Sequence, residues 1–190
     1  VCDEERRPSR RGFLSVAATG ALAGLALTSV PAFAAGGATT TVTADEALAK
    51  LKAGNEKYVK GPELCAAQLS AQRDHVAKSQ APWATIVSCA DSRVPPELLF
   101  GGLGVGELFV ARNAGNMVDT ATMGTIEYGS GVLGVPLIIV LGHERCGAVA
   151  AACEVVEKKT KFPASIAPMV NAIVPAAQAV KGKPGDFVDN

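Results

Sequence analysis

The sequence predicts an α/β fold in which a mostly parallel central β-sheet is flanked by helices. Two short apolar runs, at residues 84–88 and 137–142, are rich in β-branched residues and lack the alternation of a half-exposed strand, so we expect both to be fully buried strands. Helical patterns separate the apolar runs, which is typical of parallel sheets with right-handed crossovers. A chain of 190 residues, 48% of them hydrophobic, is long enough for one domain with a sizeable core.

The first expected helix opens at a capping box, residues 43–46, and ends at the Gly-Pro pair 61–62. Its expected apolar face comprises Leu48, Leu51 and Tyr58. Gly54 is expected to weaken its middle. Further helices are expected at residues 66–78, near 95–97, and at 119–131, 147–158 and 166–180, with a third strand at 108–111. In the 119–131 helix we expect Met123, Ile126 and Tyr128 to face inward.

The composition excludes several kinds of protein. Eighteen basic residues balance eighteen acidic ones, and no basic block follows the N-terminus, which argues against a nucleic-acid surface and favours a small or neutral substrate. The glycines at 101–106 lack the G-x-G-x-x-G spacing of a dinucleotide site. Five cysteines are an odd number, so a disulfide framework is not expected. Cys65 and Cys153 have no assigned role, and Cys153 is expected to be a small buried residue.

The first 34 residues have the pattern of a twin-arginine signal peptide. Arg10-Arg11 precede an apolar region at 16–30 and a small-x-small cleavage site at 32–34. We expect cleavage after Ala34, export to the periplasm or beyond, and no stable membrane span afterwards; the alternative is an uncleaved anchor. A linker at 35–44 and a zinc-dependent domain at 45–190 complete the expected organisation.

Metal-capable side chains follow both buried strands. Cys89 ends the first run, and His143 and Cys146 follow the second. Because the carboxyl ends of parallel strands open on one edge of a sheet, we expect these three residues to converge there. Two thiolates and one imidazole make a tetrahedral zinc site with one open position, which suits catalysis more than structure.

Asp91 and Arg93 follow the first cysteine closely. Asp91 is near enough either to ligate zinc or to accept a hydrogen bond from a zinc-bound hydroxide, and Arg93 can hold its carboxylate in a bidentate pair. The pattern therefore predicts a switch between a closed and an open metal site. A permanently closed, structural zinc site is the alternative. Glu144 and Arg145 are interpreted as helix-entry charges.

Three motifs resemble those of the bacterial β-class carbonic anhydrases. They lie at residues 89–94, 109–116 and 143–148, within a similarity that extends from about residue 48 to 190. The resemblance implies that Cys89, His143 and Cys146 bind one Zn²⁺ per subunit and that Asp91 and Arg93 form the catalytic dyad. The implied reaction is reversible hydration of carbon dioxide to bicarbonate and a proton through a zinc-bound hydroxide.

The resemblance also implies how the substrate is held. Gln80 matches a glutamine that donates a hydrogen bond to bicarbonate, and Phe109 and Tyr128 match an apolar carbon dioxide pocket built across a dimer interface. We therefore expect a homodimer or a higher oligomer. Hydrolysis of carbon disulfide or carbonyl sulfide, and a non-enzymatic binding module with a closed zinc site, are the alternative functions.

Two departures from the family pattern stand out. Ile86 occupies the place where some members carry a tryptophan of a regulatory bicarbonate site, although Arg112 matches another residue of that site. In the family a segment like 186–190 leads into a further helix and an edge strand. We therefore expect the domain to be incomplete at its C-terminal end.

Overall fold

The computed structural model describes residues 39–61 and 69–189. The expected signal peptide at 1–34, the start of the linker, Cys65 and the first residues of the expected 66–78 helix lie outside the described residues. Among the helices of the described ranges, none combines the length and the apolar character needed to cross a membrane.

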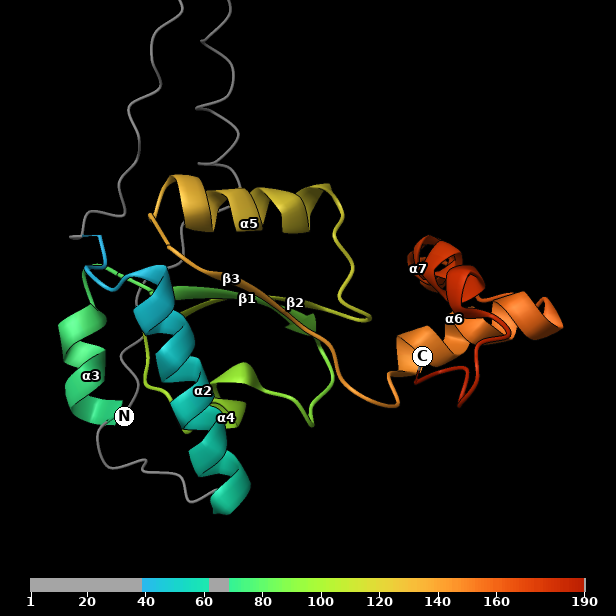
Figure 1. Ribbon diagram of the computed structural model, residues 1–190. Helices are drawn as coiled ribbons and strands as arrows, with labels where there is room; N and C mark the ends of the chain where they lie inside the picture. Colours follow the sequence, from blue (N-terminus) through green and yellow to red (C-terminus); the bar gives the residue numbers. More distant parts are fainter. Residues whose placement is uncertain (1–38, 62–68, 190) are drawn as a thin grey trace, which may run out of the picture. The chain divides into compact units, whose positions relative to one another are not determined.

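Three parallel strands form the sheet, in the order β2-β1-β3 (Figure 1). They are β1 (Ala84–Cys89), β2 (Leu108–Asn113) and β3 (Ile138–Leu141). Every residue of the central strand β1 is buried, as its unbroken apolar run predicts. The register pairs Cys89 with Asn113 and Ser88 with Leu141, so all three strands end at the same edge. The predicted α/β class with a parallel sheet is confirmed.

Helices α2 (Ala44–Lys60) and α4 (Pro96–Leu99) lie on one side of the sheet (Figure 1). The predicted capping box is present, because Thr43 and Glu46 each bond the other's backbone amide. Leu51 is buried in a core cluster with Trp83, Ala84 and Ile86. Gly54 is not merely a weak point, because a side chain there would collide with the backbone carbonyl of Phe100.

Helix α5 (Thr120–Gly131) covers the other side of the sheet over β1 and β2 (Figure 1). Asp119 caps its first turn by accepting from the amide of Thr122 at 2.8 Å. Gly129 allows the close approach, since a Cβ there would lie 2.9 Å from Thr85 and from Phe109.

Two burial predictions on this side are wrong for the described chain. Met123 and Tyr128 are exposed by 46% and 38%, because α5 faces the sheet with Gly129 instead. Strand β3 is not fully buried either. Ile138 and Val140 are exposed, since α5 stops short of this edge strand, whereas Leu137 and Ile139 pack into the α2 core.

The remaining helices are α3 (Leu69–Val76), α6 (Gly147–Lys158) and α7 (Ile166–Val180). Helices α6 and α7 pack against each other around a second apolar cluster. Cys153 lies buried in this cluster, as predicted, with its thiol directed to the carbonyl oxygen of Phe187 at 3.7 Å.

Candidate metal centre

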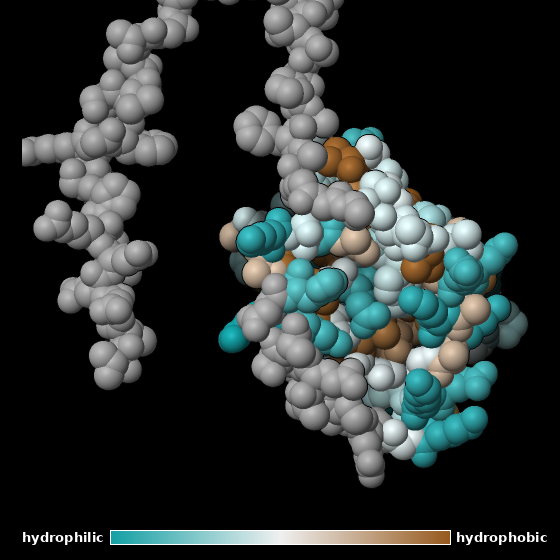
Figure 2. All heavy atoms as spheres, turned by 90° about the vertical axis from the view of Figure 1, so that its left-hand side faces the viewer, coloured by the Kyte–Doolittle hydropathy of each residue, from teal (hydrophilic) through white to brown (hydrophobic). Residues whose placement is uncertain are grey.

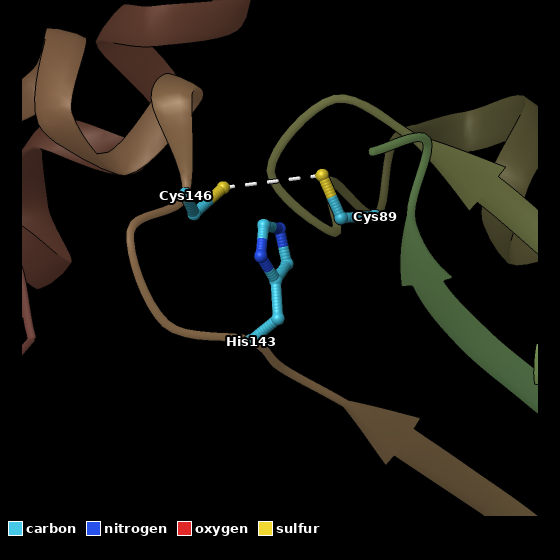
Figure 3. Close-up of side chains that lie close together, drawn as sticks. All are labelled: Cys89, His143 and Cys146. Carbon is cyan, nitrogen blue, oxygen red and sulfur yellow. Dashed lines mark hydrogen bonds between the residues drawn. The ribbon is translucent and has the colours of Figure 1, made fainter. Parts of the chain in front are cut away.

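Cys89, His143 and Cys146 come together at the carboxyl edge of the sheet (Figure 3). One ligand atom from each residue lies within 4.8 Å of the other two, and the two sulfur atoms are 3.9 Å apart. Cys89 is the last residue of β1, whereas the other two lie between β3 and α6. The parallel register therefore brings together donors that are more than fifty residues apart in the sequence.

The imidazole of His143 is oriented by its own loop. Its Nδ1 lies 3.0 Å from the carbonyl oxygen of Glu144, which can only accept, so Nδ1 carries the proton. The lone pair is then on Nε2, a buried atom without a partner among the described residues. A buried nitrogen without a hydrogen bond, beside two sulfur atoms, fits a metal ligand.

The Cys89 thiol is prepared for ionisation. Burial pushes its pKa upward, but hydrogen bonds, first that from the Gly115 amide at 3.4 Å, outweigh burial and lower the pKa from 9.0 to about 7. The Asp91 amide and the Cys146 thiol act in the same direction. Metals bind the thiolate, so this environment favours the ligand form.

The group fits zinc in chemistry and in spacing. Two sulfur atoms that each lie about 2.3 Å from a tetrahedral zinc ion are about 3.8 Å apart, close to the 3.9 Å observed. Two thiolates and one imidazole are typical zinc donors, and three protein ligands leave a fourth position open. Within the described residues Asp91 is not part of the group.

Asp91 and Arg93 form the bidentate pair that their spacing predicts. Nε of Arg93 donates to Oδ1 at 2.9 Å and a terminal nitrogen donates to Oδ2 at 2.7 Å, while the Arg93 amide donates to Oδ1 at 2.9 Å. These bonds hold the pKa of Asp91 well below its usual range and raise the pKa of Arg93. Arg93 also donates to the carbonyl oxygen of Arg145 at 3.2 Å, which links the dyad to the loop between His143 and Cys146.

Two residues of the 109–116 motif support the site in ways that the sequence did not predict. Arg112 donates to the carbonyl oxygens of Cys89 and Asp91 at 2.8 and 2.6 Å, and so fixes the backbone that presents both side chains. Asn116 donates to the carbonyl oxygen of Leu141, at the end of β3. Both lie in the 109–116 motif, whose polar residues directly after a strand were the available signal.

The proposed substrate residues are not brought to this metal group within the chain. Gln80 is exposed and precedes β1, whereas Cys89 ends it. Phe109 pairs with Thr85, four residues before Cys89, or about 13 Å along the strand. Its ring and that of Tyr128 are 6.1 Å apart, so these two residues do form a pair.

Comparisons with known proteins agree with this geometry. A family model described as carbonic anhydrase matches residues 84–189. Carbonic anhydrase 2 of Mycobacterium tuberculosis is 43% identical over 126 residues, which are 66% of this chain and 60% of that protein. The carbonic anhydrase of Mycolicibacterium smegmatis is 40% identical over 126 residues, 66% of this chain and 61% of that protein. The chain thus spans about 60% of the length of these curated relatives.

A solved structure gives the same result. The β-carbonic anhydrase of Coccomyxa superposes with a TM-score of 0.54 at 34% identity, over 75% of this chain and 63% of that chain. The residues matched by the family model include all three members of the metal group and the Asp91–Arg93 pair.

Proposed function

Since this chain belongs to the β-carbonic anhydrase family, we propose that it catalyses the reversible hydration of carbon dioxide to bicarbonate and a proton. The observation that carries the proposal is the meeting of Cys89, His143 and Cys146 at the sheet edge, within 4.8 Å of one another. These three residues would hold Zn²⁺. A bound zinc ion supplies a Lewis acid that makes water a nucleophile at neutral pH.

Asp91 and Arg93 orient the attacking water and take part in the release of its proton. Arg93 keeps Asp91 ionised, so the carboxylate only accepts hydrogen bonds. Asp91 then accepts a hydrogen bond from the attacking water and orients its lone pair toward the substrate carbon. The side chain of Asp91 is 18% exposed and that of Arg93 58%, which leaves the pair accessible to solvent for proton release.

The substrate pocket requires a second copy of the chain. Phe109 and Tyr128 form an aromatic pair away from their own metal group, and Tyr128 is exposed. Gln80 is exposed as well. We propose that these residues serve the metal site of a partner subunit in a homodimer or larger oligomer.

Export by the twin-arginine route and maturation after Ala34 are proposed from the sequence alone, in the part of the chain outside the described residues.

Carbon dioxide hydration measured by stopped flow on the zinc-loaded protein tests the proposed activity. We expect turnover above the uncatalysed rate, loss of zinc and activity in Cys146→Ser, and retention of both in Cys153→Ala, whose thiol lies in the α6–α7 cluster. A zinc-loaded sample with no turnover above background would contradict the proposal.

A further inference from the structure

The segment at residues 186–189 is held on the α6–α7 cluster. Phe187 and Val188 pack against this cluster, and the amide of Val188 donates to Oδ1 of Asp186 at 2.8 Å. The segment lies with α6 and α7 at the end of the sheet where the strands finish (Figure 1). Figure 2 views the opposite end, where small apolar areas lie among hydrophilic side chains. The apolar anchors and the turn therefore place Asp189 on the side of the metal group.

Asp189 contacts the metal loop, which we define as residues 143–146 and which carries two of the three donors. Its Oδ1 accepts a hydrogen bond from the backbone amide of Arg145 at 3.2 Å. At the other end of the same peptide unit, the carbonyl oxygen of Glu144 accepts from Nδ1 of His143 at 3.0 Å. The carboxylate, the peptide and the imidazole thus form one chain of hydrogen bonds that leads to the buried Nε2 of the metal group.

The two hydrogen bonds of this chain strengthen each other. A carboxylate that accepts from the amide N–H makes the carbonyl oxygen of that peptide a stronger acceptor, because hydrogen bonds in series polarise one another. A stronger acceptor holds the Nδ1 proton of His143 more firmly and increases the electron density on Nε2. Histidine ligands of metals usually have a carboxylate or a carbonyl at the far nitrogen. Here both are present, with the carboxylate of Asp189 one peptide unit behind the carbonyl.

The backbone of the metal loop also needs support at this point. Arg145 has a φ of 52°, in the left-handed region that side chains disfavour. Its amide is held by Asp189 and its carbonyl oxygen by Arg93, at 3.2 Å in each case. Because this turn separates His143 from Cys146, the two hydrogen bonds keep the two donors directed to one point.

We propose that Asp189 is a positioning residue of the metal centre and acts on His143 through the peptide between Glu144 and Arg145. It touches neither the metal nor the substrate. It fixes the direction of the imidazole and makes Nε2 a stronger ligand. The inference rests on the proposed function only in taking Cys89, His143 and Cys146 as zinc ligands, and it makes no use of turnover.

Zinc affinity, measured on the full chain by competition with a chelator, tests the proposal. Asp189→Ala should weaken zinc binding about tenfold, the lower end of the effect expected when a partner of a histidine ligand is removed. Asp189→Asn keeps the shape and an acceptor oxygen but loses the charge, so it should recover part of the affinity. Asp186→Asn is the matched control, because it removes a charge from the same segment and keeps the acceptor for the Val188 amide. Equal zinc affinity in Asp189→Ala and Asp186→Asn would overturn the proposal.

The imidazole N–H resonance distinguishes this role from simple support of the fold. The sequence has two histidines, so ¹⁵N-histidine labelling and a His75→Gln variant assign the signal of His143. In the zinc-loaded protein its Nδ1 proton should move upfield in Asp189→Ala and less far in Asp189→Asn, because the Glu144 carbonyl becomes a weaker acceptor. An unchanged resonance in both variants would overturn the proposal, even if stability or zinc affinity falls.

Both measurements are independent of carbon dioxide turnover. A zinc-loaded wild-type chain without turnover would contradict the proposed function and leave this inference standing. An active wild-type chain whose Asp189→Ala variant keeps the zinc affinity and the His143 resonance would contradict this inference alone.

Discussion

Arg93 shapes the site at the scale of single residues. Its side chain donates two hydrogen bonds to the Asp91 carboxylate and one to the Arg145 carbonyl, and its backbone amide donates a third to Asp91. This one residue therefore holds both the carboxylate and the loop that carries His143 and Cys146. The pairing of Asp91 with Arg93 could be predicted, because the two residues are two positions apart in the sequence. The attachment to the Arg145 carbonyl could not, because it depends on how the two loops meet.

Replacing Arg93 by alanine should lower kcat for carbon dioxide hydration by about 100-fold or more, because the Asp91 carboxylate loses the group that orients it. Zinc content should stay unchanged, since all three donors remain. Arg93→Lys keeps the charge but not the bidentate geometry, so it should recover only a small part of the rate. Full activity in Arg93→Ala would contradict the positioning role.

At the scale of elements, the loop that follows β2 packs against α6 and α7 at Gly115. Gly115 has a φ of 77°, and its amide donates to the sulfur of Cys89. A Cβ at this position would lie 2.6 Å from Ile173 and 2.9 Å from Ala148. Gly115 thus contacts both the ligand Cys89 and the helices α6 and α7, which follow the ligand Cys146.

Gly115→Ala should therefore destabilise the fold by about 1 to 3 kcal/mol, through the left-handed backbone and the collision with both helices. Zinc affinity should fall as well, because the hydrogen bond from the amide of residue 115 to the Cys89 sulfur is displaced. Gly124→Ala is the matched control, since that helical position has open space around it and alanine there favours the helix by about 1 kcal/mol. Equal stability and zinc affinity in the two variants would refute the close contact.

Helix caps make the fold sensitive to acid. Hydrogen bonds from Thr43 lower the pKa of Glu46, and those from Thr122 lower the pKa of Asp119. A carboxylate with a depressed folded-state pKa stabilises the fold above its ordinary pKa, and the contribution is lost as the pH falls through the folded value. Relative to the parent chain, a Glu46→Gln/Asp119→Asn variant should lose less stability on acidification below about pH 4.5, the ordinary value for Glu46. Urea unfolding at several pH values measures this difference, and parallel pH profiles would count against it.

Local patterns predicted most of the elements because their signals are short-range. The capping box at residues 43–46 starts α2, and both α6 and α7 have the expected bounds. Burial of β3 and of Met123 could not be predicted in the same way, since an apolar run does not reveal what covers it. Gly54 shows the opposite case: glycine is unfavourable in a helix, but only a residue without a side chain leaves room for the Phe100 carbonyl.

At the scale of the whole molecule, apolar side chains remain uncovered on the α5 side of the sheet. The most exposed of the larger ones on α5, at its C-cap and on β3 are Met123, Val132, Ile138 and Val140. Val140 pairs with Val87, whose side chain lies on the same face of the sheet as that of Thr85, the residue that Gly129 of α5 contacts. The exposed residues of β3 and those of α5 therefore lie on one side of the sheet. Within the described chain β3 is also an edge strand, and exposed apolar edges favour association.

We expect the zinc-loaded chain to be a dimer or larger by light scattering after size exclusion. Met123→Lys combined with Val140→Lys should shift it toward the monomer, because two charges would have to be buried at the interface. Val59→Lys is the control, since Val59 is 76% exposed on α2, comparable to the 72% of Val140. If Tyr128 completes a partner's pocket, the monomeric variant should lose carbon dioxide hydration but keep its zinc. A wild-type monomer with full activity would exclude a shared pocket.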